Sequence, residues 1–478
     1  MGRRGGAARR TLLAVLASVT LPLGAEDFVL VNGQWFDGER FVGRRAYVSG
    51  GIFVERSETA GGGAEVDLGG GFVVAPYGDA HAHVFYDPGN YGEDIELFRR
   101  QGVYAVLVQD SIVPPEARLS ELLGSPGTPS FRITWGILTS RASGFAPPGS
   151  PVFFVEDVGS LEGQWREVAS RPVDFLKVIL AFSERHQGGV AEAPVGVAPA
   201  VLGRLVELAH RDGLQVSAHI ETAADFRLAL DAGVDYIAHL PASWRVAPGD
   251  GPRSTGFSDS DPSRWLLTDD DARRAARLGT ALVTTTFRDR SSADYPLHAE
   301  IMRRNIGRLL EAGARVVLGT DFGGEIIDEV EHVAALTGAD RAHLVRILTM
   351  DTPRAILPDR RVGGLEPGNE ASFLVLGGDP LRDLGHLRDI RARMIAGRIY
   401  GIDVGEGPDH GAGAPLACQS PGTGHRRGSG APRPAVPQAP IASRSASTCG
   451  RPARRMRRWA AATGYSRRYQ RTTWRPSS

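Results

Sequence analysis

The feature that most constrains the fold is a repeated alternation between short β-branched runs and segments with helical spacing of apolar residues. It begins near residue 76 and continues to about residue 359. Such an alternation is typical of βα units that share a parallel sheet. Strands are expected over residues 72–79, 103–109, 131–138, 173–180, 214–219, 234–239, 281–286 and 315–321, with helices over 199–211, 222–232, 269–278 and 298–312. This α/β pattern predicts a closed (β/α)₈ TIM barrel, which takes roughly 250 residues.

The segments on either side of this repeat carry short β-rich runs of a different kind. Residues 26–75 alternate such runs with Gly-rich turns, and residues 360–400 return to short strands. Together they predict a small β-sandwich domain built from N- and C-terminal segments, with the barrel occupying residues 76–359. Residues 401–478 are rich in Gly, Pro, Ser and Arg without periodicity, which predicts a disordered basic tail.

The first 25 residues contain four arginines, no acidic residue and an apolar run over residues 12–23. The run is shorter than the roughly 20 apolar residues of a membrane span, so it predicts an export signal. Arg9 and Arg10 before the run are similar to a twin-arginine signal, which predicts a location in the bacterial periplasm. An N-terminal membrane anchor or a wrongly assigned start codon stays open as an alternative.

The distribution of charge excludes one class of partner. The chain has 55 basic and 55 acidic residues, but residues 401–478 hold 13 Arg against three acidic residues. Residues 26–400 keep 38 basic and 52 acidic residues, a net charge of −14, which excludes electrostatic binding of nucleic acid. We expect a small-molecule substrate and no membrane contact beyond export, and we leave a homo-oligomer open. Both cysteines, Cys418 and Cys449, lie in the basic tail, so no disulfide or thiolate is expected in the barrel.

Histidines and an aspartate stand at the carboxyl ends of four expected strands. His81 and His83 follow the first strand, His219 and His239 close the fifth and sixth, and Asp321 closes the eighth. Residues two apart in a strand point the same way, so His81 and His83 form half of a metal site. Barrel enzymes gather their sites at this end of the strands. Five candidate ligands there favour a metal centre over isolated core histidines.

Lys177 is the only lysine among the 55 basic residues, and it lies within an apolar strand. A buried ammonium is costly unless it is paired or neutralised. Arginine cannot supply a neutral amine in its place, because the guanidinium stays protonated. A neutral lysine amine reacts with CO₂ to give a carbamate, an anionic ligand with two oxygens. A Schiff base, or a structural pairing with Asp174 or Glu184, is the alternative.

With these residues assembled, the chain resembles the amidohydrolase superfamily, in its imidazolonepropionase-like and prolidase-like branch. The motifs that carry the resemblance are Asp79-Ala-His81-Ala-His83, Asp174-Phe-Leu-Lys177, His219 followed by Ala229-Leu-Asp-Ala-Gly-Val-Asp-Tyr-Ile-Ala-His239, Gly319-Thr-Asp321, and Gly364-Leu-Glu-Pro-Gly368 with Gly378-Asp-Pro380. The resemblance implies two divalent metal ions. One would be held by His81, His83 and Asp321, the other by His219 and His239, and carboxylated Lys177 would bridge both. Imidazole and carboxylate ligands suit Zn²⁺ best, with Mn²⁺, Ni²⁺ or Fe²⁺ as alternatives.

The same resemblance implies hydrolysis of a C–N bond in an amide, a cyclic amide or a dipeptide by a metal-bridging hydroxide. Asp321 would take the hydroxide proton and pass it to the departing amine. Three alternatives stay open: hydrolysis of a lactone, ester or phosphoester at the same site, a mononuclear deaminase, and a non-catalytic binding protein on the same fold.

Five further residues stand near the ends of expected strands. Asp79 would orient a ligating histidine through its carboxylate. Tyr86, Asp110, Arg185 and Thr285 are candidates for substrate binding. For each of these four, a position on the rim of the site with no specific role is the alternative.

Overall fold

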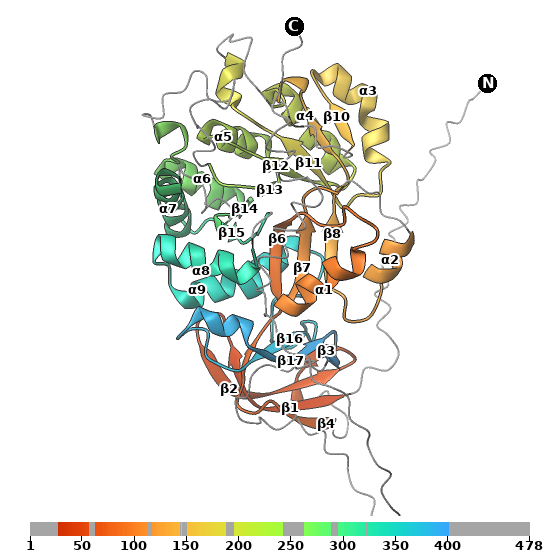
Figure 1. The fold of residues 1–478 in the computed structure, drawn as a ribbon, viewed down its shortest axis with the longest axis vertical. Coiled ribbons are helices and arrows are strands. Elements are labelled where there is room, and N and C mark those ends of the chain that lie inside the picture. Colours follow the sequence, from red (N-terminus) through yellow and green to blue (C-terminus); the bar gives the residue numbers. More distant parts are fainter. Residues whose placement is uncertain are drawn as a thin grey trace, which may run out of the picture.

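The fold is known from a computed structural model, which describes most of residues 27–400 (Figure 1). The description leaves out residues 57–62, 112–116, 144, 146–150, 188–195, 242–261, 288–294 and 322–323. The expected export signal at residues 1–25 and the expected basic tail at residues 401–478 also lie outside the described residues. No helix among the described residues has the length and apolar character needed to cross a membrane.

Strands from both ends of the described chain form one mixed sheet, seen in red and blue at the lower end of Figure 1. The N-terminal strands are β1 (Phe28–Phe36), β2 (Phe41–Ser49), β3 (Ile52–Val54), β4 (Ala64–Asp67) and β5 (Phe72–Val74), and the C-terminal strands are β16 (Phe373–Leu376), β17 (Ile390–Ile395) and β18 (Arg398–Tyr400). The order is β18-β17-β16-β5-β1-β2-β3, with β4 paired to β1. Because β5 pairs with β16, the two ends of the described chain share one sheet.

This sheet has an apolar core of its own, to which both segments contribute. Trp35 on β1 is 1% exposed, and its ring centroid lies 5.9 Å from that of Phe53 and 5.6 Å from that of Phe373. Phe373 comes from β16, so its burial attaches the C-terminal segment to the N-terminal one. Burying one such side chain fully is worth roughly 1.5–3 kcal/mol.

The middle of the chain forms parallel strands with helices around them (Figure 1). One sheet has the order β10-β9-β11-β12-β13-β14-β15, and another contains β6, β7 and β8. The strands are β6 (Tyr77–Ala82), β7 (Val103–Val108), β8 (Ser130–Ile133), β9 (Ile137–Thr139), β10 (Val152–Phe154), β11 (Phe175–Ile179), β12 (Gln215–His219), β13 (Tyr236–Ile237), β14 (Ala281–Val283) and β15 (Val316–Val317). The predicted α/β class with a parallel sheet is confirmed.

Backbone contacts connect both edges of the three-stranded sheet to the seven-stranded one. The amide of Asp174, just before β11, donates to the carbonyl of Ile133 at the end of β8, at 3.0 Å. At the other edge Ala82 on β6 forms an isolated parallel bridge with Asp321, which follows β15. The first and last strands of the repeat are therefore neighbours where two of the predicted ligands lie.

Two of the expected strands are divided in the structure. Residues 72–79 do not form one strand, because β5 belongs to the small sheet and β6 begins at Tyr77. Pro76 lies between them, and proline has no amide hydrogen to donate to a strand ladder. Residues 131–138 are likewise divided into β8 and β9. Gly136 between them has a φ of 88°, a conformation that glycine adopts without strain.

The helices follow the strands in the predicted alternation. They are α1 (Tyr91–Gln101), α2 (Ala117–Leu123), α3 (Val158–Ala169), α4 (Pro199–Arg211), α5 (Ala223–Ala232), α6 (Asp269–Leu278), α7 (Tyr295–Glu311), α8 (Ile326–Thr337), α9 (Arg341–Arg346) and α10 (Thr352–Ile356). The predicted bounds of α4 and α6 are confirmed. Thr222 and Thr268 precede α5 and α6, and each hydroxyl accepts the backbone N–H of the aspartate three residues later. These capping boxes fix where the helices start, and so where the preceding loops end.

The inner face of the parallel strands changes character along its length. Leu107 on β7 and Phe175 on β11 belong to one buried apolar cluster. Since side chains alternate along a strand, Gln109 and Lys177, two residues further on, extend from the same face. Both are buried, with 0% and 4% exposure. Polar groups therefore replace apolar ones toward the carboxyl ends of the strands.

Candidate metal centre

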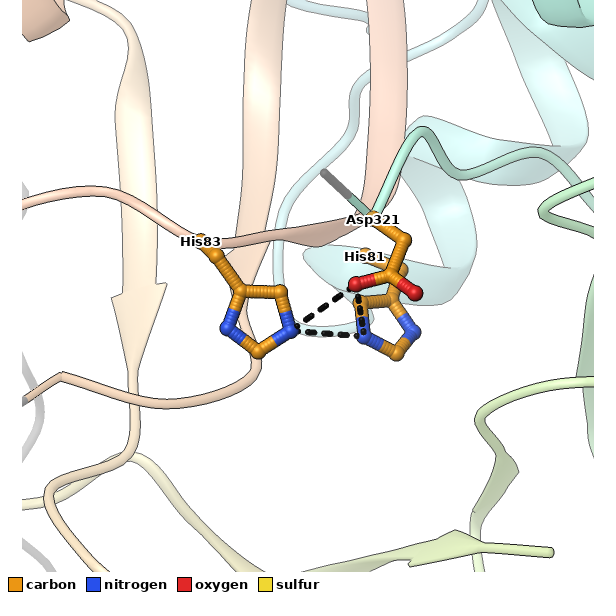
Figure 2. A group of neighbouring side chains, drawn as sticks. All are labelled: His81, His83 and Asp321. Carbon is orange, nitrogen blue, oxygen red and sulfur yellow. Dashed lines mark hydrogen bonds and ion pairs between the residues drawn. The ribbon is translucent and has the colours of Figure 1, made fainter. Parts of the chain in front are cut away.

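His81, His83 and Asp321 bring three donor atoms together where β6 and β15 end. Figure 2 shows the three side chains pointing toward one another. Nε2 of His81 lies 3.1 Å from Nε2 of His83, and Oδ1 of Asp321 lies 3.6 and 3.1 Å from these two atoms. Ligands at 2.0–2.1 Å from a tetrahedral zinc ion are about 3.3 Å apart. The spacing therefore fits three corners of one coordination shell.

The close approach of β6 and the segment after β15 depends on Gly319. A Cβ atom at this position would lie 2.7 Å from Cβ of His81, closer than real Cβ contacts allow. Two residues later, the amide of Asp321 donates to the carbonyl of His81 at 2.6 Å. Asp321 has a φ of 54°, in the left-handed region that few residues other than glycine adopt. Such strain is held by the surrounding structure and is typical of functional sites.

The buried carboxylate of Asp79 ties the same two segments together. Its oxygens accept the backbone N–H of His81 at 3.0 Å, the backbone N–H of Thr320 at 3.1 Å and the hydroxyl of Thr320 at 2.7 Å. Burial raises the pKa of Asp79 to about 7, although these hydrogen bonds act in the opposite direction. The sequence predicts that the carboxylate of Asp79 orients a ligating histidine. In the structure this carboxylate binds the backbone of His81 and of Thr320.

His219, at the end of β12, and His239, just after β13, lie beside this group. The ring centroids of His81 and His239 are 4.6 Å apart, and those of His239 and His219 are 4.9 Å apart. The hydroxyl of Thr285 lies 2.9 Å from Nδ1 of His239, and Oε1 of Glu221 lies 3.3 Å from Nε2 of His219. The four histidines thus lie together at the carboxyl ends of the strands.

The four residues expected to contact substrate lie in different settings. The hydroxyl of Tyr86 lies 2.8 Å from Nδ1 of His83, so Tyr86, like Thr285, contacts a histidine of the site. Such partners fix the orientation and tautomer of an imidazole ring. Asp110 is buried, and its charge acts on the neighbouring lysine. Arg185 lies in the turn Ser183–Gln187, and its side chain is outside the described part of the structure.

Lys177 extends from β11 into the same region. Its Nζ atom donates to Oε1 of Gln109 at 3.0 Å. Burial lowers the pKa of Lys177 from 10.5 to about 7, against the charges of Asp321 and Asp110, which act to raise it. Near neutral pH a substantial fraction of the amine is therefore uncharged, which is the form that reacts with CO₂.

Sequence reasoning missed four polar residues of this region. Gln109, Ser217 and Glu221 stand at period-two spacing from inward-facing residues such as His219, and this spacing is the signal that would have found them. Glu329 comes from α8, is 0% exposed and accepts three backbone N–H groups of the loop after β14. No local pattern marks Glu329, because its partners are distant in the sequence.

Comparison with known proteins identifies the family. The sequence model of the amidohydrolase family matches residues 160–400, about half of the chain. The chain belongs to the amidohydrolase family. The matched segment contains Lys177, His219, His239 and Asp321. His81 on β6 and His83 just after it precede this segment, and the fold brings them to the other four residues.

Individual proteins of known sequence or structure agree with this assignment. An uncharacterised protein of Mycobacterium tuberculosis is 26% identical over 366 residues, which cover 71% of this chain and 88% of that protein. A putative prolidase from Bifidobacterium longum has a TM-score of 0.62 at 19% identity, over 79% of this chain and 95% of that one. Phenylurea hydrolase B has a TM-score of 0.59 at 16% identity, over 78% and 96%. These structures establish a fold of the amidohydrolase TIM-barrel type, and the prolidase-like neighbour agrees with the expected branch.

Proposed function

We propose that this amidohydrolase is a metal-dependent enzyme that cleaves the C–N bond of an amide, a cyclic amide or a dipeptide. The observation that carries the proposal is the convergence of four histidine rings, Asp321 and a buried lysine at the carboxyl ends of the strands. Family membership supports a hydrolase. Neighbours named as a putative prolidase and a phenylurea hydrolase support the C–N bond as the target.

The donor set fits two divalent metal ions, Zn²⁺ first and Mn²⁺, Ni²⁺ or Fe²⁺ as alternatives. The three residues of Figure 2 would hold one ion, His219 and His239 the other, and a carbamate formed from CO₂ on Lys177 would bridge them. The ring partners support an assignment of the ligating nitrogens. With Thr285 on Nδ1, His239 would bind through Nε2, and with Glu221 on Nε2, His219 would bind through Nδ1.

Divalent ions bound here would polarise the substrate carbonyl and supply a hydroxide near neutral pH. The residues of the chain would position these groups and move protons. Asp321 would accept a proton at a carboxylate oxygen and then donate it to the nitrogen of the departing amine. Asp79 and Gly319 would keep Asp321 in place, because they set the approach of its backbone to β6.

We also infer the architecture around the site in finer detail. The contacts of Ile133 with Asp174 and of Ala82 with Asp321 support one closed (β/α)₈ barrel over residues 76–359. The separate apolar core of the small sheet supports a β-sandwich that buries this core between two layers. Residues 26–75 and 360–400, on either side of the barrel in the sequence, would form this β-sandwich.

We further propose that residues 1–25 export the protein to the periplasm, which Arg9, Arg10 and the apolar run after them support. A net charge of −14 over residues 26–400 supports a small-molecule substrate and no nucleic-acid partner. A reporter fused to residues 1–25 should reach the periplasm. Light scattering of the purified protein will determine whether it forms a homo-oligomer.

The proposed reaction is tested on protein purified without chelator. Metal content is measured first, and hydrolysis is then assayed on panels of dipeptides, N-acyl amino acids, cyclic amides, lactones, esters and phosphoesters. We expect two metal ions per chain and turnover of at least one C–N substrate. Turnover confined to lactones, esters or phosphoesters would change the assigned bond. One ion per chain with an unimpaired Lys177→Met variant would indicate a mononuclear deaminase, and full occupancy without any turnover would indicate a binding protein.

A further inference from the structure

We propose that Gln109 positions the lysine carbamate, and that Ser217 and the carbonyl of Ala80 hold Gln109 in the orientation that this requires. The inference rests on the proposed function, because it concerns the form of Lys177 that would bridge two ions. It makes Gln109 a positioning residue, which acts on the site through Lys177.

Gln109 lies at the centre of a buried set of hydrogen bonds that joins four strands. Its Oε1 atom accepts from Nζ of Lys177 at 3.0 Å and from the hydroxyl of Ser217 at 2.8 Å. Its Nε2 atom donates to the carbonyl of Ala80 at 3.1 Å. Gln109 and Ser217 are 0% exposed. An amide in such a place costs free energy unless its polar atoms are bonded, and each end of this amide is.

These partners determine which way the Gln109 amide points. The carbonyl of Ala80 can only accept a hydrogen bond, so the NH₂ group must face it. The amide oxygen is then directed toward Lys177 and Ser217, both of which can donate. If the amide turned over, two donors would face one another at Lys177, and the carbonyl of Ala80 would face an oxygen. The orientation is therefore fixed by the network around it.

The chemistry of carbamate formation explains why an acceptor is needed at this point. The amine nitrogen forms a bond to the carbon of CO₂, one C–O double bond opens to give a carboxylate, and one proton leaves the nitrogen for solvent. The product keeps a single N–H, and its nitrogen is planar because the lone pair is delocalised into the carboxylate. Oε1 of Gln109 is already at hydrogen-bonding distance from that nitrogen.

Accepting this N–H has two consequences for the group. It satisfies a donor that would otherwise be buried without a partner, which costs about 1–3 kcal/mol in proteins generally. It also fixes the plane of the carbamate, since the N–H and the two oxygens share that plane. With the N–H held by Gln109, both oxygens are directed away from Gln109.

A purely structural role for Gln109, as a link between β7 and Ala80 on β6, makes different predictions. It would affect the unfolding of the metal-free protein and leave CO₂ capture at Lys177 unchanged. The positioning role would change CO₂ capture and binding of the second metal ion in a protein that remains folded. Capture of labelled CO₂ therefore separates the two roles.

The experiment uses full-length protein, freed of metal and then reloaded with Zn²⁺ over a series of ¹³C-bicarbonate concentrations. Label on Lys177 is followed by NMR and native mass spectrometry, and metal content by elemental analysis. Gln109→Met keeps the length of the side chain and removes the acceptor. Gln164→Met is the matched control, since Gln164 on α3 is partly buried and donates to the carbonyls of Phe154 and Ser160.

In Gln109→Met we expect the bicarbonate concentration for half-maximal labelling to rise about tenfold or more, and the second Zn²⁺ to be lost in parallel. Gln164→Met should behave as the wild type. Ser217→Ala should shift labelling in the same direction by a smaller factor, because Oε1 of Gln109 keeps its contact with Lys177 but loses the hydroxyl that steadies it.

The outcomes distinguish this inference from the function on which it rests. Wild-type labelling and two Zn²⁺ ions in Gln109→Met would overturn the inference and leave the proposed function intact. Absence of label from Lys177 in the wild type would contradict the carbamate bridge itself. If circular dichroism shows that Gln109→Met does not fold, Ser217→Ala decides, and an unchanged bicarbonate dependence in that variant counts against the inference.

Discussion

Two neighbouring layers of side chains on the inner face of the parallel strands present opposite environments. In one layer, Leu107 on β7 and Phe175 on β11 pack in a buried apolar cluster, and neither side chain has a polar group to satisfy. Two residues further along the same strands, Gln109 and Lys177 are equally buried and polar. The first region gains free energy from the removal of apolar surface from water. The second costs free energy, as the lowered pKa of Lys177 and the raised pKa of Asp79 indicate.

Stability and chemistry are therefore assigned to alternate residues of one strand. Phe175 and Lys177 belong to β11 and are two positions apart. Substitution of one should affect unfolding and leave metal binding unchanged, and substitution of the other should do the reverse. Variants at these two positions can therefore break or support the division.

The largest expected effect is the loss of activity in Lys177→Met. The variant keeps an unbranched chain but removes the amine, so the carbamate bridge cannot form. We expect about one metal ion per chain and a fall in kcat/KM on the order of 10³-fold or more. The free energy of unfolding of the metal-free protein should stay level or rise, because a buried polar group is removed. Elemental analysis, kinetics and urea denaturation check this, and full activity with two ions would contradict it.

The next effect is the loss of stability in Phe175→Ala. The substitution leaves a cavity in the apolar cluster that contains Leu107 and Tyr236. We expect the free energy of unfolding of the metal-free protein to fall by about 3–5 kcal/mol. The folded fraction should still bind two metal ions, because the polar groups two residues further on are unchanged. Loss of metal without loss of stability in this variant would break the proposed division.

The same division explains which parts of the site the sequence predicts. His219, His239 and Asp321 each close an apolar run, and the carboxyl ends of parallel strands meet at one place. Their convergence can therefore be read from local patterns. The bounds of α4 and α6 follow from apolar periodicity and from local signals at their starts, Pro199 in the first turn of α4 and the cap at Thr268 before α6.

Partners between strands are what the sequence leaves out. The contact of Gln109 with Lys177 joins residues of two strands that are not neighbours in either sheet, and neither strand specifies the other locally. The break between β5 and β6 at Pro76 is not predicted by the sequence for a related reason. An apolar run before a proline predicts a strand, but only the pairing of β5 with β16 assigns that strand to the small sheet.

A third prediction concerns how the stability of the metal-free protein depends on pH. The pKa of Lys177 is lowered from 10.5 in the unfolded chain to about 7 in the fold. Its contribution to stability is therefore fully present above pH 10.5, is lost as the pH falls toward 7, and is constant below that. The difference in unfolding free energy between wild type and Lys177→Met should follow this curve. Its slope should be at most about 1.4 kcal/mol per pH unit.

The comparison with Lys177→Met removes the effect of Asp79 from this measurement. The pKa of Asp79 is raised from 3.8 to about 7, so its contribution is present below pH 3.8 and is lost as the pH rises toward 7. Both proteins share that loss. The difference in unfolding free energy between wild type and Lys177→Met could instead stay constant from pH 7 to 10.5. That result would show that the surroundings of Lys177 do not disfavour its charged amine.

The smallest expected effect is that of Thr285→Val on the metal ion that His219 and His239 would hold. Valine keeps the branched shape and removes the hydroxyl that lies 2.9 Å from Nδ1 of His239. The backbone N–H of residue 285 would still donate to Glu329, so the loop should keep its place. We expect the dissociation constant of the more weakly bound Zn²⁺ to rise about 10- to 100-fold. This is the typical loss of affinity when the hydrogen-bond partner of a ligating histidine is removed.

Thr285→Val tests the polar layer by itself, because it changes one polar contact and no apolar one. Thr337→Val at the end of α8, whose hydroxyl donates to the carbonyl of Val333, is the matched control and should bind both ions as the wild type does. The affinities are measured by titrating metal-free protein with Zn²⁺ against a competing chelator. Equal weakening of both ions would mean that the loop had moved. Weakening of the ion at His219 and His239 alone would mean that the polar layer holds metal through single polar contacts, which the apolar layer can neither supply nor replace.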